Sequence, residues 1–331
     1  MKKITMEHVA KALNVSAMTV SKAFQNSPDI SQSMRRKVFE AAKAVGYVYP
    51  KKKRTNIIVL SKESFLSKGD TFYNELFFRL NEQSQAFLCQ ISLTVVKDTE
   101  ALAFIQNFDL SHFDGVALMG QFHRDFLLHL ELNQVPFICI DFYEHGIAAD
   151  MILSNNFIAS YEATAHLLNH GHERIHFIGT LNATSSINDR YFGYCKAMTE
   201  FNCEAEIKSI DDRNGHGLKV QFDLGDHYPT AFVCNNDHTA YLLIQQLHSK
   251  GLKVPQDISV MGFDDVSYSR DSNPTISTMR VSRTYMAEQA LSILMMRIND
   301  TTGNHFKKIS LDCSLIERDS TGPNPEKKDE L

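Results

Sequence analysis

Apolar residues recur every three to four positions in short stretches at the N-terminus, a spacing that places them on one face of a helix. In the first two stretches these residues are Val9, Ala10, Leu13, Val20, Ala23 and Phe24. Thr5 and Ser16 stand directly before the two stretches, where a hydroxyl can accept a hydrogen bond from an unpaired N–H of the first turn. The pattern predicts two helices joined by a tight turn, a helix-turn-helix within residues 5–31.

A third amphipathic stretch follows, with Ser31 as its expected cap and Gly46 at its end. The inner face of this helix is expected to consist of Met34, Val38, Phe39, Ala42 and Val45. Three such helices can close on one another around their apolar faces. We therefore expect a small all-α head over residues 1–49.

The exposed side of the second helix carries small or hydrogen-bonding side chains at Ala17, Met18, Ser21 and Lys22. Such groups fit the floor of the DNA major groove, and Thr19 lies near enough to reach a phosphate. The residues of the head that we expect to contact DNA are Thr5, Ser16, Ala17, Met18, Thr19, Ser21, Lys22, Asn26 and Ser31. This helix is predicted to read the DNA sequence.

Charge is divided unevenly along the chain. Residues 1–54 contain 12 of the 34 basic residues and three of the 39 acidic ones, a net charge of +9. The rest of the chain keeps 22 basic and 36 acidic residues, a net charge of −14. The basic segment is typical of a nucleic-acid-binding domain, and it disfavours the alternative of a charged, solvated bundle.

A short basic linker joins the head to the rest of the chain over residues 50–56. Pro50 is followed by Lys51, Lys52, Lys53 and Arg54, and an apolar run begins only two residues later. These four cations are predicted to form an extended arm that binds phosphates or a narrow minor groove. A merely solvated linker is the alternative.

Beyond the linker, short apolar runs rich in β-branched residues alternate with amphipathic helical stretches. This alternation predicts an α/β core. The expected strands are Ile57–Leu60, Ile91–Val96, Gly115–Met119, Phe137–Asp141, Ile175–Ile178, Ala231–Cys234 and Ile258–Phe263. The core is expected over residues 57–320.

Several of these strands end in polar residues, and ligands of parallel sheets bind beyond the carboxyl ends of strands. Asp141, Asn236 and Asp264 are therefore candidates for ligand contact. For Asp237 and Asp265, which follow directly, capping of the next helix is an equal alternative. The sequence predicts a ligand pocket at this edge.

Composition narrows the remaining possibilities. No run approaches the roughly 20 apolar residues of a membrane span, and the N-terminus does not read as a secretory signal, so we expect a cytoplasmic protein without a membrane partner. The terminal KDEL sequence is then a coincidence within a disordered tail over residues 321–331. The six cysteines show no paired spacing and are expected to be reduced.

Catalytic and metal-binding patterns are weak. The chain has no GxSxG, GxxxxGK[ST] or HExxH motif, and nothing marks Asp264 or Asp265 as a glycosidase acid. Histidines at 166, 170, 172 and 176 make a metal site conceivable, although they surround a turn between a helix and a strand. We expect no enzyme activity, no metal and no cofactor.

Longer motifs carry a resemblance to a known family. The head contains NVSAMTVSKAFQNSPDIS and AAKAVGYVYP, and the core contains FDGVALMG, VPFICID, HLLNHGHERIHFIG, DRYFGYCKAM, PTAFVCNND and VPQDISVMGFDD. Their order and spacing resemble those of the lactose-repressor/galactose-repressor (LacI/GalR) family of transcriptional regulators, from about Lys3 to Thr321.

The resemblance implies a fold class: an N-terminal all-α helix-turn-helix head plus an α/β two-lobed core similar to periplasmic sugar-binding proteins. Three crossovers would join the lobes, lobe one over about 57–155 and 282–305 and lobe two over about 156–281 and 306–320. The core would form a homodimer, so that two heads meet a two-fold symmetric operator in double-stranded DNA.

The resemblance also implies ligand contacts. Arg190 occupies the place of a family arginine that binds ligand hydroxyls, Asn236 and Asp264 match two further ligand residues, and Asp141 stands where lobe one contributes. Carboxylate, amide and guanidinium groups suit a polyol. The aromatic residues near these motifs, which could pack against a sugar, are Phe72, Tyr73, Phe142 and Tyr268.

The chain departs from the family pattern in three places. The linker is too short for a hinge helix, so we expect less operator bending and coupling through the spacing between heads. Asn156 and Ala159 replace an aspartate–asparagine pair and a glycine, and Asn188 replaces a second arginine. The predicted function is a repressor that senses a small carbohydrate; alternatives are a corepressor-activated regulator sensing a purine or nucleoside, and a ligand-independent DNA-binding protein.

Overall fold

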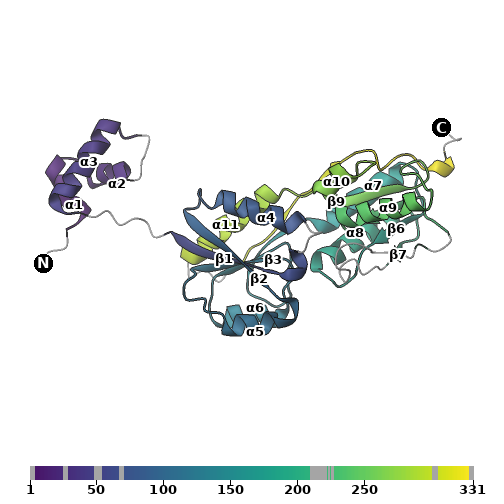
Figure 1. The fold of residues 1–331 in the computed structure, drawn as a ribbon, viewed down its shortest axis with the longest axis horizontal. Helices are drawn as coiled ribbons and strands as arrows, with labels where there is room; N and C mark the ends of the chain where they lie inside the picture. The colour runs from purple at the N-terminus through teal and green to yellow at the C-terminus, as the bar shows by residue number, and fades with distance from the viewer. Residues whose placement is uncertain are drawn as a thin grey trace. The chain divides into compact units, whose positions relative to one another are not determined.

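The computed structural model describes residues 4–24, 29–47, 54–66, 71–208, 222, 224, 227–299 and 305–327. Contacts divide the chain into two units, Met1–Arg54 and Thr55–Leu331, so the division falls within the expected linker. The first unit is the head, and the second is the core (Figure 1).

The head contains α1 (Met6–Leu13), α2 (Ala17–Phe24) and α3 (Gln32–Val45), as predicted. Ser16 Oγ accepts the backbone N–H of Thr19 at 3.0 Å, and Ser31 Oγ accepts that of Met34 at 3.2 Å. The buried side chains that hold the three helices together are Val9, Ala10, Val20, Ala23, Val38 and Ala42. The expectation that Phe39 belongs to this inner face is wrong, because its ring packs edge-on against Phe24 and remains 48% exposed.

The core contains two six-stranded sheets. The first has the order β11-β5-β4-β3-β1-β2, and all of its strand pairs are parallel. Its strands are β1 (Thr55–Lys62), β2 (Cys89–Val96), β3 (Gly115–Met119), β4 (Phe137–Ile140), β5 (Asp150–Ser154) and β11 (Lys308–Leu311).

The second sheet has the order β12-β10-β9-β8-β6-β7, and only β12 runs antiparallel to its neighbour among the described strands. Its strands are β6 (Ile175–Ile178), β7 (Glu206–Lys208), β8 (Ala231–Cys234), β9 (Ser259–Asp264), β10 (Ser277–Arg280) and β12 (Ser314–Ile316).

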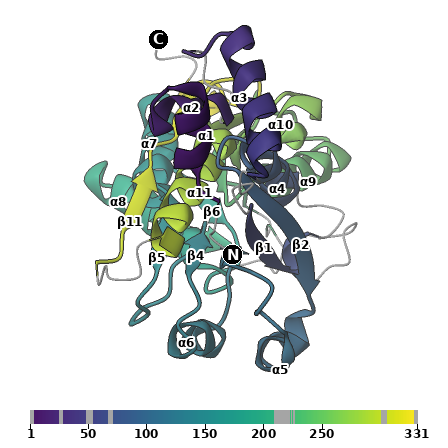
Figure 2. The same cartoon turned by 90° about the vertical axis from the view of Figure 1, so that its left-hand side faces the viewer.

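Helices cover both faces of each sheet, which explains why the central strands are apolar on both sides. In lobe one, defined by the first sheet, α4 (Thr71–Gln83) and α11 (Arg283–Asn299) lie on one face, and α5 (Ala101–Asn107) and α6 (Arg124–Leu132) lie on the other (Figures 1 and 2). In lobe two, defined by the second sheet, α7 (Asn156–Asn169) and α8 (Ser185–Glu200) cover one face. The opposite face holds α9 (Asp237–Ser249), near α10 (Ser267–Asp271). The short 3-10 helices are Glu63–Phe65, Asp98–Glu100 and Pro325–Lys327.

The chain passes between the lobes three times: after β5, between β10 and α11, and between β11 and β12. The expected assignment of 306–320 to lobe two is wrong for β11, since Lys308–Leu311 pairs with Met151–Ser154 of the first sheet. The third crossing therefore lies at Asp312 and Cys313.

The C-terminal segment 321–327 packs against lobe two, so the expected disordered tail is wrong for these residues. Asn324 is buried, and its Nδ2 donates to the Gly171 carbonyl at 2.8 Å. The buried His172 ring is 2.9 Å from the Gly322 carbonyl through Nε2. Main-chain and imidazole groups near the 171 turn thus supply hydrogen-bond partners for the C-terminal segment, which its polar composition does not reveal. Residues 328–331 lie outside the described part of the chain.

The stability of the protein is expected to fall as the pH drops below about 6.5, the ordinary pKa of histidine. Burial lowers the pKa of His172, and burial together with His170 lowers the pKa of His166. The unfolded chain then binds protons that the folded protein does not, which favours unfolding. Urea unfolding at pH 7.5 and pH 5.5 measures the free energy of unfolding at each pH. The difference between the two values should be smaller in His172→Gln than in the wild type. An equal difference in both proteins would contradict the assignment to His172.

Candidate DNA-binding and effector sites

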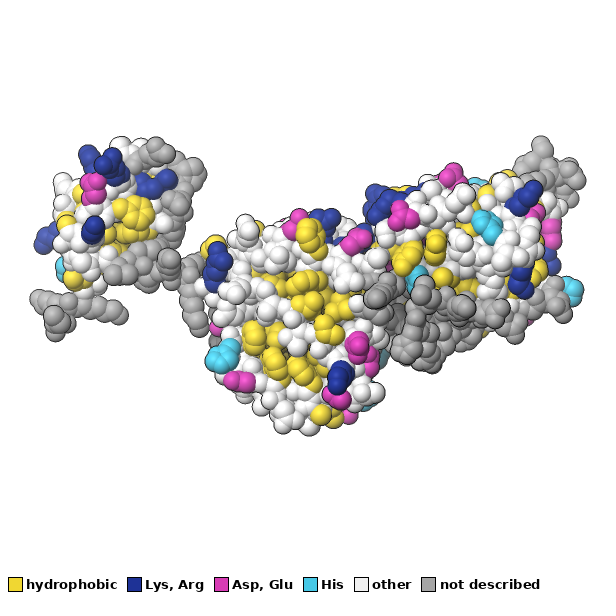
Figure 3. All heavy atoms as spheres, in the orientation of Figure 1, with side chains coloured by type: hydrophobic (Ala, Val, Ile, Leu, Met, Phe, Trp, Pro, Cys, Tyr) yellow, Lys and Arg dark blue, Asp and Glu magenta, His cyan; other side chains and the backbone are white. Residues whose placement is uncertain are grey.

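The surface of α2 presents the residues that we expect to contact DNA. Ala17 and Met18 are exposed, and Met18 is 70% accessible, while Ser21 and Lys22 are half-buried. A short apolar and hydroxyl-bearing surface of this kind allows close approach to base edges. Figure 3 shows Lys and Arg side chains on the head.

Two of these side chains already have partners within the head. The Thr19 hydroxyl lies 2.9 Å from Ser16 Oγ, and Lys22 Nζ donates to Asp29 Oδ2 at 2.9 Å. Asp29 therefore positions the Lys22 ammonium group at the side of α2, and DNA must compete with this carboxylate. Thr5, Ser16, Ser31 and Arg54 are exposed, whereas Asn26 and residues 51–53 lie outside the described residues.

Arg190 is the centre of a buried network in lobe two. Its Nε donates to Asn156 Oδ1 at 2.8 Å, its Nη1 donates to the Asn235 carbonyl, and its Nη2 donates to Asp264 Oδ1 at 3.1 Å. The guanidinium carbon also lies 3.7 Å from the centre of the Phe263 ring. All three nitrogens of the guanidinium are thus engaged by the protein, and Asn156, one of the departures from the family pattern, is a partner.

The carboxylates at the strand ends have unusual backbone geometry. Asp141 has φ 67°, Asp264 has φ 101° and Asp265 has φ 52°. Residues other than glycine rarely adopt a positive backbone φ. Such strain persists where surrounding contacts impose it, and it often marks functional sites. Tyr73 donates its hydroxyl to Asp141 Oδ2 at 2.8 Å, so two of the expected ligand residues bind each other.

A small cavity brings together four of the expected ligand residues. Its described lining consists of Thr71, Phe72, Asn236, His238, Asp264, Val266 and Tyr268. Its volume is about 30 Å³, which holds a water molecule but not a sugar ring. Asn236 also caps α9, since its side-chain oxygen accepts the Thr239 N–H at 2.8 Å, so this residue both caps the helix and lines the cavity.

Three other polar or aromatic expectations have structural explanations. Phe142 is fully buried in the core between the first sheet and α6, so the expectation that it faces a sugar is wrong. Asp237 accepts hydrogen bonds from the Thr278 hydroxyl and the Val266 N–H, and burial together with Asp264 raises its pKa well above the usual range. Asp265 accepts from Arg280 and Arg318, which hold its pKa low against the effect of burial.

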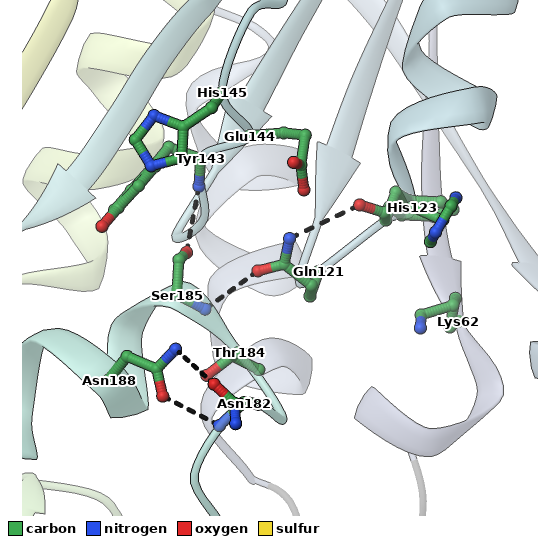
Figure 4. Close-up of a pocket in the computed structure, with 11 residues that line it drawn as sticks. Lys62, Gln121, His123, Tyr143, Glu144, His145, Asn182, Thr184, Ser185 and Asn188 are labelled. Carbon is green, nitrogen blue, oxygen red and sulfur yellow. Dashed lines mark hydrogen bonds between the residues drawn. The ribbon is translucent and has the colours of Figure 1, made fainter.

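A larger pocket lies between the lobes (Figure 4). Its volume is about 380 Å³, comparable to small-molecule sites in proteins. Its described lining consists of Lys62, Gln121, Phe122, His123, Tyr143, Glu144 and His145 from lobe one and Asn182, Thr184, Ser185 and Asn188 from lobe two. None of the eight expected ligand residues lines it. Among the described lining residues, the sequence drew attention only to Asn188, as a departure from the family pattern.

Hydrogen bonds across this pocket join the two lobes. Ser185 donates its N–H to Gln121 Oε1 at 3.0 Å, and its hydroxyl accepts the Tyr143 N–H at 3.1 Å, so Ser185 lies between two lobe-one residues in Figure 4. Tyr143 also donates its hydroxyl to Asp189 at 3.0 Å, and burial raises the pKa of that carboxyl. A change in the angle between the lobes must break or move these contacts.

The histidines near the 171 turn have separate roles. The rings of His166 and His170 are tilted against each other with their centres 4.4 Å apart, and His176 pairs with Glu206 at 3.0 Å. Within the described part of the chain, no group of three or more metal-ligating side chains gathers. None of the helices in that part is long and apolar enough to cross a membrane.

Comparison with known proteins agrees with this architecture. The family description "Bacterial regulatory proteins, lacI family" matches residues 5–49, and "Periplasmic binding protein-like domain" matches residues 164–321. The probable HTH-type transcriptional repressor ExuR of Bacillus subtilis is 28% identical over 304 residues, which cover 84% of this chain and 86% of that protein.

Solved structures share the fold. The transcriptional regulator CelR in complex with cellobiose has a TM-score of 0.71 and 22% identity, over 96% of this chain and 100% of that one. A LacI family regulator from Enterococcus faecium with bound ribose has a TM-score of 0.71 and 20% identity, over 81% of this chain and 99% of that one.

A helix-turn-helix head and a two-lobed periplasmic binding protein-like core define a class: transcriptional regulators with a DNA-binding head and an effector-binding core. The chain carries a DNA-binding head of the lacI family of bacterial regulatory proteins and a periplasmic binding protein-like domain, as its motifs indicated.

Proposed function

We propose that this protein represses transcription from a specific operator, and that a small sugar bound between the lobes changes its affinity for that operator. The observation that carries the proposal is the polar pocket of about 380 Å³ that both lobes line. A ligand in this pocket touches both lobes, so its affinity depends on the angle between them. By linkage, the ligand in turn shifts the arrangement of the lobes.

The chemistry of the pocket suits a polyhydroxyl ligand. Gln121, Asn182 and Asn188 offer amides that both donate and accept, and Thr184 and Ser185 offer hydroxyls. The cellobiose and ribose held by the two similar regulators support a sugar here. If the sugar weakens operator binding tenfold, operator DNA must weaken sugar binding tenfold, a coupling of about 1.4 kcal/mol.

On the DNA side, α2 is proposed to enter the major groove with Ala17, Met18, Ser21 and Lys22 toward the bases. The cations of residues 51–54 are proposed to follow the backbone or the minor groove beside it. Because β1 begins at Thr55, directly after these cations, we propose that coupling acts through head spacing and bends the operator little. A protein that acts on bacterial DNA works in the cytoplasm.

Two alternatives predict different ligands. A corepressor-activated regulator would bind a purine or nucleoside and then bind DNA more tightly. A ligand-independent protein would bind neither class, and its interlobe hydrogen bonds would simply hold the lobes together.

Thermal unfolding of the full-length protein with a panel of sugars and purines separates these functions. A ligand at 100 times its dissociation constant stabilises the folded state by about 2.7 kcal/mol, which shifts the melting temperature measurably. Operator duplexes selected from random DNA are then titrated with and without the active compound. A sugar that raises the melting temperature and weakens operator binding supports the proposal; a purine that strengthens binding, or no shift with any compound, rejects it.

Lys22→Ala is expected to lower the preference for operator over random DNA roughly 5- to 150-fold, because a base contact is worth about 1–3 kcal/mol. Competition binding with both duplexes measures this preference. The matched control replaces Lys51, Lys52 and Lys53 with glutamine, which should weaken binding to both duplexes and reduce the salt dependence. An unchanged preference in Lys22→Ala would show that α2 is not the reading helix.

We also propose that two copies pair through the edge of lobe one. Strand β2 is the edge of the first sheet, and Phe78, Leu88 and Val95, on and near α4 and β2, are about half exposed. Figure 3 shows apolar side chains over the region of β1 to β3. Such a face is a typical protein interface. Sedimentation is expected to report a dimer that Val95→Glu weakens; a monomeric wild type would contradict the pairing.

A further inference from the structure

We propose that the sugar bound in the interlobe pocket carries an anionic group, a carboxylate or a phosphate, and that Lys62 binds this group. The inference rests on the proposed function and names the ligand class of the same pocket. It follows from the side chains that line the pocket, from the partners of Lys62, and from the distribution of neutral polar groups.

Basic side chains outnumber acidic ones in the described lining. Lys62, His123 and His145 are the basic groups, and Glu144 is the acidic one. In Figure 4, Lys62 and His123 lie on the side of the pocket opposite to Asn188. A neutral sugar does not require the Lys62 ammonium on this side, whereas a carboxylate or phosphate gains a charge-assisted hydrogen bond from it.

Lys62 retains donors for a ligand. It is the last residue of β1 and therefore lies at the carboxyl end of a parallel strand, where α/β sheets bind ligands. Its nearest acid is Asp98, at 3.6 Å, which is too long for a hydrogen bond. Asp98 instead accepts the N–H of Ser64 at 3.0 Å and its hydroxyl at 2.7 Å. Asp98 is thus satisfied by Ser64, and the Lys62 ammonium has three N–H groups to offer.

The position of Lys62 strengthens its interaction with an anion. Its side chain is only 22% exposed, so an ion pair there is less screened than at the surface. The ring of Phe65 lies 5.4 Å from Nζ and restricts the side chain. A partly buried ammonium held in this way is suited to a compact anion.

The remaining lining accounts for the sugar hydroxyls. Asn188 Nδ2 donates to Asn182 Oδ1 at 3.3 Å, and Asn188 Oδ1 accepts the Asn182 N–H at 2.8 Å, so the two amides form one polar surface. This surface comes from lobe two, while Lys62 comes from lobe one. The ligand would therefore present its anion to lobe one and its hydroxyls to lobe two, which links charge recognition to lobe closure.

The test measures thermal unfolding of the full-length protein at constant sodium concentration with matched pairs of compounds. Sodium D-glucuronate and sodium D-galacturonate represent the carboxylate, glucose 6-phosphate represents the phosphate, and D-glucose and D-galactose are the neutral partners. Sodium acetate controls for the anion alone. We expect at least one anionic sugar to raise the melting temperature, and the neutral partners and acetate to leave it unchanged.

Lys62→Met then tests the residue. It keeps the length of the side chain and removes the charge, and it should weaken the binding of the active anionic sugar at least tenfold by calorimetric titration. Lys97→Met, which removes an exposed lysine outside the described lining, should leave that affinity unchanged. An unchanged affinity in Lys62→Met overturns the assignment of Lys62.

The outcomes separate this inference from the proposed function. A neutral sugar that stabilises the protein as well as its anionic partner leaves sugar sensing intact and overturns the anionic class. No stabilisation by any sugar overturns both. Stabilisation by the uronates but not by the sugar phosphate, or the reverse, supports the inference and identifies the anion.

Discussion

Replacing Arg190 with alanine is expected to lower the melting temperature of the core by roughly 6–20 °C. The substitution leaves Asp264 buried without its cation and removes donors from Asn156 and the Asn235 carbonyl. Removing one partner of a buried ion pair costs about 3–5 kcal/mol, and each kcal/mol shifts the melting temperature of a domain this large by about 2–4 °C. Thermal unfolding followed by circular dichroism measures the effect.

Two further variants locate the cause. Arg190→Lys keeps the charge but cannot donate to Asn156, Asn235 and Asp264 in the same geometry. Its melting temperature should therefore fall by an intermediate amount. Arg79→Ala removes a surface arginine of α4 paired with Glu82 at 2.7 Å, and it should change stability by less than about 1 kcal/mol. If Arg190→Ala melted like the wild type, Arg190 would not organise lobe two, and a direct role in ligand binding would regain support.

Gly193→Ala is expected to destabilise lobe two, although alanine favours helices by about 1 kcal/mol over glycine. Helices α7 and α8 approach so closely here that an added Cβ would lie 2.1 Å from the Phe157 carbonyl oxygen. This obstacle is backbone, so the helices must move apart. Overpacking typically costs about 1–3 kcal/mol, and the melting temperature should fall by roughly 2–12 °C.

Gly322→Ala is the matched control, because it adds the same methyl group in the C-terminal segment. There the nearest atoms, in Pro255, would be 3.5 Å away, an ordinary contact. Its melting temperature should stay close to that of the wild type. A Gly193→Ala protein that is more stable than the wild type would show that the helices separate without cost.

The sequence predicted seven of the twelve described strands, most of them central strands of the two sheets. The bounds of β3, β6 and β8 match the predicted ranges, because each is a short, largely apolar run followed by glycine or a polar residue. Strands β5, β7, β10, β11 and β12 were missed. In β10 the buried residues include Ser277 and Thr278, whose hydroxyls bond to Arg318 and Asp237, and β12 has only three residues. Neither β10 nor β12 has the regular alternation of apolar and polar residues by which a short strand is recognised in a sequence.

The candidate site was predicted less well, for a local reason. Phe142 and Tyr143 are adjacent aromatic residues after β4, and the sequence favoured the first. Asp141 adopts φ 67° and turns the chain, so Phe142 enters the core and Tyr143 enters the pocket. Sequence patterns do not reveal such a turn at a non-glycine residue. Gln121 and Ser185 were missed because only the tertiary fold brings them together: Gln121 follows β3 in lobe one, and Ser185 is the first residue of α8 in lobe two.

The three crossings between the lobes determine the order in which the parts of each lobe are synthesised on the ribosome. Most of lobe two is synthesised within an interruption of lobe one, because α11 and β11 follow it in the chain, and β12 then adds the last strand of the second sheet. Until residues 283–311 emerge, β5 is an open sheet edge, and the strands that α11 packs against lack that helix. Neither lobe is complete until the last part of the chain emerges, so the nascent chain exposes apolar surface to chaperones for most of its synthesis.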